Sequence, residues 1–145
     1  MRIVLIILLV FLFTGCLNEP DCIITSTNLV KINFKKDSKT AREITFTKIN
    51  VSGLPDDLYG GLKVSSVQLP VPPGDNESTF IFYFENRIDT IHVTYSKQAE
   101  VTSKSCGAYT NYSDLFVADF SFDSLRITNN RLLIHATSNL EVFLN

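Results

Sequence analysis

Hydrophobic and polar side chains alternate in short runs along most of this chain. Leu29–Lys36 places Val30, Ile32 and Phe34 on one face and lysine or asparagine on the other, the period-two pattern of a half-buried strand. Glu43–Val51 repeats the pattern after a polar turn, so these two runs are candidates for a hairpin.

A second pair of runs carries the strongest hairpin signal. Thr79–Glu85 and Asp89–Ser96 are rich in aromatic and β-branched residues and are separated only by Asn86–Ile88. Before them, the strand-like run Leu62–Val71 ends in the turn formers of Pro72–Ser78. We therefore predict that Thr79–Glu85 and Asp89–Ser96 pair antiparallel.

Further strand-like runs follow, and no window of about ten residues after the N-terminal segment has a helical stripe. These runs are Ser113–Ser124, Leu125–Thr128, Arg131–Thr137 and Leu140–Leu144. About eight short strands predict an all-β fold, namely an antiparallel β-sandwich of immunoglobulin-like or Greek-key type, with a small barrel as the alternative. Because repeats and long linkers are absent, residues 28–145 are predicted to form a single domain.

The N-terminal segment has a different composition. Arg2 is followed by eleven apolar residues, Ile3–Phe13, too few for a membrane-spanning helix, which needs about 20. This pattern is typical of a secretory signal peptide. Phe13-Thr14-Gly15-Cys16 resembles a bacterial lipobox, in which the cysteine sulfur carries diacylglycerol, although leucine is commoner than phenylalanine at the first position. We predict a signal peptide over residues 1–15 and lipid attachment at Cys16; a plain signal peptide cut elsewhere is the alternative.

Lipidation of Cys16 would leave two of the three cysteines able to form a disulfide. It leaves Cys22 and Cys106, an even pair in an oxidising compartment, which can form one disulfide. That bond closes a loop of roughly 85 residues, to which the chain-entropy model assigns about 4 to 5 kcal/mol. Two free thiols or half of a metal site are the competing interpretation, but the sequence has no Cys-x-x-Cys motif and no clustered histidines.

The charge pattern argues against one class of partner. The formal net charge is −2, with 13 basic and 15 acidic residues mixed along the chain, so no basic face suggests a nucleic acid. Residues 16–27 would form the lipidated N-terminus and a short tether that holds the domain close to a bilayer. The expected location is the bacterial cell envelope, with the outer membrane favoured, in its periplasmic leaflet or at the cell surface.

Four stretches carry a resemblance to a known family: Asp21–Phe34, Leu69–Phe82, Asp89–Ser96 and Ser103–Leu115. Together they resemble small uncharacterised lipoproteins of the Bacteroidota, classed as a domain of unknown function, over nearly all of the chain after Cys16. In that family the first cysteine after the anchor and a Cys-Gly pair recur, and they match Cys22 and Cys106–Gly107. The resemblance implies an exported β-rich domain and supports the disulfide, but it brings no known activity.

Few residues suggest chemistry. His92 and His135 are the only histidines, and nothing places a serine or cysteine nucleophile beside either, so both are interpreted as ordinary strand residues. Pro55–Asp57 and Gly74–Glu77 lack the spacing of a calcium loop and are interpreted as solvated turns. No catalytic residue, metal site or cofactor is predicted.

Two further features concern the surface. Asp123-Ser124-Leu125 resembles the Asp-Ser/Thr-apolar acceptor of Bacteroidota O-glycosylation, which makes Ser124 a candidate acceptor; Thr90 is a poorer one because it lies within a predicted strand. Tyr109 and Tyr112 are candidate contact residues, although packing over the disulfide is favoured.

These features lead us to expect a membrane-anchored envelope lipoprotein with a non-enzymatic binding or assembly role. Its expected partners are the bilayer, through acylated Cys16, and an envelope protein or glycan. The alternative is a hydrolase or carbohydrate-active enzyme whose site is assembled from loops.

Overall fold

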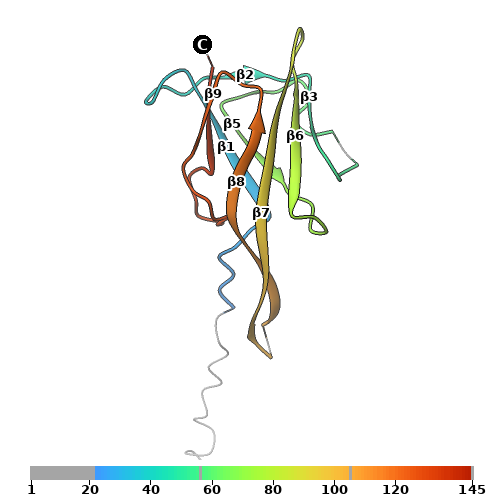
Figure 1. Ribbon diagram of the computed structural model, residues 1–145. Coiled ribbons are helices and arrows are strands. Elements are labelled where there is room, and N and C mark those ends of the chain that lie inside the picture. The colour runs from blue at the N-terminus through green and yellow to red at the C-terminus, as the bar shows by residue number, and fades with distance from the viewer. Residues whose placement is uncertain (1–21, 56, 105, 145) are drawn as a thin grey trace, which may run out of the picture.

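The computed structural model describes residues 22–55, 57–104 and 106–144, and every regular element in this part of the chain is a strand. The predicted signal peptide and Cys16 lie outside the described residues. Two four-stranded sheets pack against each other, with a short two-stranded sheet near the C-terminal end (Figure 1). The predicted all-β sandwich is therefore confirmed.

The first sheet has the strand order β5-β1-β10-β9. Its members are β1 (Leu29–Lys35), β5 (Ser66–Pro70), β9 (Ser124–Ile127) and β10 (Leu140–Phe143). β1 pairs antiparallel with β5 and parallel with β10, so the first and last strands of the chain lie side by side at the centre of this sheet. The predicted alternation of β1 is present, because Val30, Ile32 and Phe34 are fully buried.

The second sheet has the strand order β3-β6-β7-β8, and all of its neighbours are antiparallel. Its members are β3 (Lys48–Val51), β6 (Glu77–Tyr83), β7 (Ile88–Ser103) and β8 (Gly107–Phe120). β6 and β7 form the hairpin that the sequence predicts. The small sheet consists of β2 (Ile44–Thr45) and β4 (Lys63–Val64).

Phenylalanine side chains fill the space between the two large sheets. The Phe46 ring centroid lies 5.3 Å from that of Phe34 and 5.5 Å from that of Phe82, and Phe82 is also 5.3 Å from Phe122. Tilted and edge-on pairs at these distances are favourable in addition to the area that they bury. Five of the described phenylalanines are buried in this interior, namely Phe34, Phe46, Phe80, Phe82 and Phe122.

The predicted hairpin between Leu29–Lys36 and Glu43–Val51 is wrong. The second run is interrupted at Phe46, and β3 beyond it pairs with β6 in the opposite sheet. Phe46 is fully buried, and the backbone N–H of Thr47 donates to the carbonyl of Tyr83, so the chain crosses between sheets here. Burial of one aromatic ring outweighs the local tendency of adjacent strands to pair.

The predicted strand Arg131–Thr137 is also wrong. This segment bends, and Lys31 donates from its ammonium group to two of its carbonyl oxygens. The fully buried amide of Asn139 donates to two more carbonyls, one of them from Arg131. Side chains thus satisfy backbone groups that a neighbouring strand would otherwise pair with. His135 consequently lies in an exposed turn and not in a strand.

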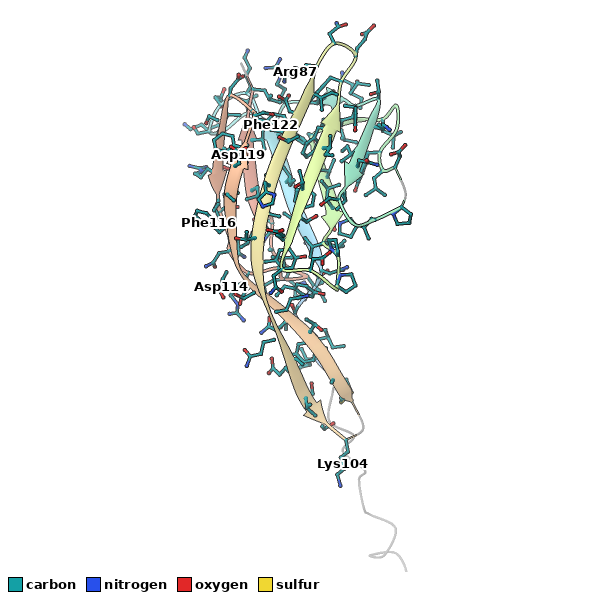
Figure 2. The ribbon with its side chains drawn as sticks, turned by 45° about the vertical axis from the view of Figure 1, so that its right-hand side comes forward. Arg87, Lys104, Asp114, Phe116, Asp119 and Phe122 are labelled. Carbon is teal, nitrogen blue, oxygen red and sulfur yellow. A yellow bond between two sulfur atoms is a disulfide. The ribbon has the colours of Figure 1, made fainter. Side chains whose placement is uncertain are left out.

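β7 and β8 are longer than predicted and continue past the sandwich as a two-stranded ribbon, formed by Lys97–Ser103 and Gly107–Tyr112 (Figures 1 and 2). The register shifts between Thr94 and Ser96, where Asp114 on the partner strand has a φ of 55°. Bulges of this kind bend a strand pair and increase its twist. The ribbon therefore leaves the sandwich at an angle that the irregularity sets.

Candidate functional site

The described N-terminal segment is attached to the ribbon. Cys22 and Cys106 form a disulfide with their Cα atoms 5.4 Å apart, so the predicted bond is present in the structure. Cys106 lies in the turn between β7 and β8. The bond therefore joins the start of the described chain to the end of the ribbon that is farthest from the sandwich.

Hydrogen bonds hold the same segment against the base of the ribbon. The Ser26 hydroxyl accepts from the backbone N–H of Tyr112 and donates to the carbonyl of Leu132. The Ile134 N–H donates to the carbonyl of Thr25. Ser26 is buried, so its two bonds satisfy a polar group that would otherwise be costly at this depth.

The two tyrosines in the ribbon have different environments. Tyr112 is buried and stacks at a tilt on Tyr95, with ring centroids 6.0 Å apart, so its ring packs on the sandwich side. Tyr109 lies nearer the ribbon turn and is partly exposed. Its hydroxyl donates to the Glu100 carboxylate, and this bond raises the pKa of Tyr109. Of these two tyrosines, only Tyr109 is placed to contact a partner.

The end of the ribbon carries exposed aliphatic side chains. Val101 pairs across the ribbon with Ala108 and is 73% exposed, and Ile23, next to the disulfide, is 68% exposed. Ile24 is also exposed. Lys104 lies at the tip, at the end of the molecule opposite Arg87 (Figure 2). We name Ile23, Ile24 and Val101 the tip aliphatics.

An open hollow of about 730 Å³ lies beside the turn before β6. Its lining consists of Ser52, Gly53, Asp75, Asn76, Glu77, Thr94, Tyr95, Ser96 and Asp114. The Tyr95 hydroxyl donates to the Pro72 carbonyl, and burial together with the charge of Asp75 raises the pKa of Tyr95 to about 12. Tyr95 therefore stays protonated and structural at neutral pH.

His135 lies in an exposed turn, and His92 contacts a hydroxyl and a carboxylate of the neighbouring strand β6. His92 Nδ1 shares a hydrogen bond with the Thr79 hydroxyl at 3.0 Å, and its Nε2 lies 3.6 Å from a Glu77 carboxylate oxygen. These contacts join neighbouring strands on a half-exposed face. In the described part of the chain, no three histidine, cysteine, aspartate or glutamate side chains gather closely enough to hold a metal ion.

An apolar edge was not anticipated from the sequence. β8 is the outer strand of its sheet and contacts β9, the outer strand of the other sheet. Phe116 on β8 is 60% exposed, and Phe120 and Ile127 are exposed as well. We name these three side chains the β8–β9 edge. Phe116 pairs with Thr94 and points away from the buried Leu115, whereas Phe120 pairs with Ile91 and Ile127 with Leu140 at the margin of the interior.

Ser124 is the first residue of β9 and is exposed. Thr90, the poorer glycosylation candidate, is half-buried within β7. Glycosylation of Ser124 stays a prediction, and its exposure is compatible with modification.

Comparison with known proteins identifies one family. No curated protein and no solved structure matches this chain. No helix among the described residues has the length and apolar character needed to cross a membrane. A family described as "Family of unknown function (DUF6452)" matches residues 48–144, from the start of β3 to one residue beyond β10. The match carries no information on lipidation or bacterial source, which stay predictions. By this match over more than half of its length, the chain belongs to the DUF6452 family of unknown function.

Proposed function

We propose that this protein is a lipid-anchored component of the bacterial envelope, held in the outer membrane, whose sandwich domain binds another envelope component and carries out no catalysis. The anchoring part rests on the lipobox-like Phe13-Thr14-Gly15-Cys16. It is supported by the Cys22–Cys106 bond, because disulfides persist in exported proteins and are rare in the cytosol.

The binding part rests on the β8–β9 edge. An aromatic side chain as exposed as Phe116 on an outer strand is a liability that soluble proteins normally cover or charge. Outer strands with adjacent apolar side chains are also a recurrent place for a partner to add a strand or dock. Phe116 is therefore the residue on which the binding proposal depends.

Intact mass of the membrane-extracted protein tests the anchor. The expected mature chain begins at Cys16 and carries the mass of attached acyl groups. Cys16→Ala should abolish this mass and release the protein from the membrane fraction. A mature chain that begins elsewhere, without acyl mass, would refute the anchoring proposal.

Affinity capture from detergent-solubilised envelope tests the binding edge. We expect a partner that is captured by the wild-type protein and lost with Phe116→Asp. Ile88→Asp is the matched control, because Ile88 is 58% exposed at the start of β7, next to Arg87 at the end of the molecule remote from the ribbon tip. Equal capture by both variants would show that the edge is not the binding surface.

A further inference from the structure

We propose that the end of the ribbon rests on the lipid surface, with the tip aliphatics at the boundary between headgroups and acyl chains, so that the ribbon holds the sandwich away from the membrane. This inference rests on the proposed anchoring at Cys16, and it assigns a role to a part of the molecule that the binding proposal does not use. It follows from three observations: the length of the tether, the position of the disulfide and the exposed side chains.

The tether limits the distance between the lipid and the ribbon. Cys22 follows Cys16 by six positions. Since an extended chain spans at most about 3.6 Å per residue, these positions reach roughly 20 Å. The disulfide then brings the Cα atom of Cys106 within 5.4 Å of that of Cys22. The turn of the ribbon is thereby tied to the anchor at short range.

The short tether favours lipid, and not a folded protein, as the neighbour of the ribbon end. A small protein domain is about 30 Å across, which exceeds the roughly 20 Å that the tether spans. A folded partner would therefore not fit between the ribbon end and the bilayer. The lipid anchor instead brings the bilayer surface itself within this distance of the ribbon end.

The side chains at this end have the chemistry of a membrane interface. Val101 and Ile23 expose apolar surface that would be removed from water where it meets the outer part of the acyl chains. Tyr109 combines an apolar ring with a polar hydroxyl, and tyrosine is enriched at such interfaces. Lys104 at the tip would attract anionic headgroups.

Two further charged groups of the ribbon do not oppose this arrangement. The Glu100 carboxylate accepts the hydrogen bond from Tyr109. Lys97, nearer the sandwich, donates from its ammonium group to the Pro73 carbonyl at 2.7 Å. Glu100 pairs with Tyr109 and the next residue, Val101, pairs with Ala108, so the carboxylate lies on the ribbon face opposite Val101.

The absence of tryptophan from the sequence provides a direct test. Val101→Trp in the full-length lipidated protein introduces a single indole, at the ribbon end. The protein is reconstituted in vesicles of phosphatidylethanolamine and phosphatidylglycerol with brominated acyl chains, which quench indole on contact. We expect Val101→Trp to lose most of its emission relative to vesicles without bromine, with a shift to shorter wavelength.

Ile88→Trp is the matched control, because Ile88 is similarly exposed at the opposite end of the molecule. Its emission should be unaffected by bromine. The double variant Cys22→Ser/Cys106→Ser in the Val101→Trp background should retain its acyl mass but lose most of the quenching. The exposed positions of both introduced tryptophans leave the fold intact, which the far-ultraviolet circular dichroism spectrum verifies.

The outcomes separate this inference from the anchoring proposal. Acyl mass on Cys16 with unquenched Val101→Trp would overturn the inference and leave the anchor standing. A shift of the Val101→Trp emission to shorter wavelength in native envelopes, but not in pure lipid vesicles, would assign the ribbon end to a protein and also overturn it. Absence of acyl mass would overturn the anchoring proposal itself.

Discussion

β7 and β8 run through two regions that are stabilised in different ways. Within the sandwich, β7 contributes fully buried residues such as Ile91 and Val93, which pack against the phenylalanine cluster. In the ribbon, the same two strands expose most of their side chains on both faces. An isolated two-stranded hairpin is marginally stable in water. The ribbon therefore needs the disulfide and the Ser26 hydrogen bonds that tie it to the N-terminal segment.

This difference shows that a regular backbone does not reveal what stabilises it. Both halves of the β7–β8 pair have the same ladder of antiparallel hydrogen bonds, interrupted by shifts in register. In one half the burial of apolar surface dominates, and in the other a covalent bond and a few polar contacts replace it. Substitutions should consequently have unequal effects in the two regions.

The largest effect is expected at the centre of the sandwich. Phe82→Ala removes a fully buried ring that contacts Phe34, Phe46 and Phe122, and should lower the free energy of unfolding by about 3–5 kcal/mol. Urea unfolding measures the change. Phe116→Ala at the exposed edge is the control, with a change within about 0.5 kcal/mol. Similar losses of unfolding free energy in both variants would contradict the expected difference between the interior and the exposed edge.

Removal of the disulfide should have the next largest effect. Cys22→Ser/Cys106→Ser releases a link between positions 84 apart, and should cost about 2–4 kcal/mol of unfolding free energy. Hydrogen exchange should accelerate most at the amides of the ribbon, because little apolar burial protects them. The wild-type protein under reducing conditions should behave in the same way. Unchanged exchange in the ribbon would mean that its strands are stable without the bond.

A buried polar network within the sandwich should matter less, but measurably. Asn139 is fully buried; its side-chain oxygen accepts from the Lys31 N–H, and its amide donates to the carbonyls of Asn129 and Arg131. Asn139→Ala leaves these partly buried backbone groups without their side-chain partner and should cost about 1–3 kcal/mol. Asn86→Ala in the exposed β6–β7 turn is the control. Equal unfolding curves for the two variants would refute a structural role for the network.

The smallest expected effect is on the pH dependence of stability, at the junction between the sandwich and the ribbon, where Tyr95 stacks on Tyr112. Burial raises the pKa of Tyr95 from 10.0 to about 12, so the folded protein retains this proton more strongly than the unfolded chain does. The resulting stabilisation is complete below pH 10 and is lost as the pH rises through about 12. Urea midpoints across this range should fall less steeply in Tyr95→Phe. Parallel pH profiles for the two proteins would rule out this contribution.

Part of the candidate site could be predicted from sequence because its signals are local. The cysteine count predicts the Cys22–Cys106 pair, and the alternation around Ile91 and Val93 predicts strand β7. The β8–β9 edge could not be found in this way. Phe116 alternates with the buried Leu115, so whether it is covered depends on what packs on the outer face of the sheet, and the pattern of a single strand does not contain that information.

The sequence by itself determined the all-β class and the β6–β7 hairpin, because period-two alternation and a short connection act between residues that are close along the chain. Only the tertiary structure decided that β1 lies between β5 and β10, that Phe46 directs the chain into the other sheet, and that β7 and β8 extend beyond both. These outcomes depend on burial against partners distant in sequence. The position of Cys106 at the end of the ribbon, beside the start of the described chain, is likewise a property of the folded molecule.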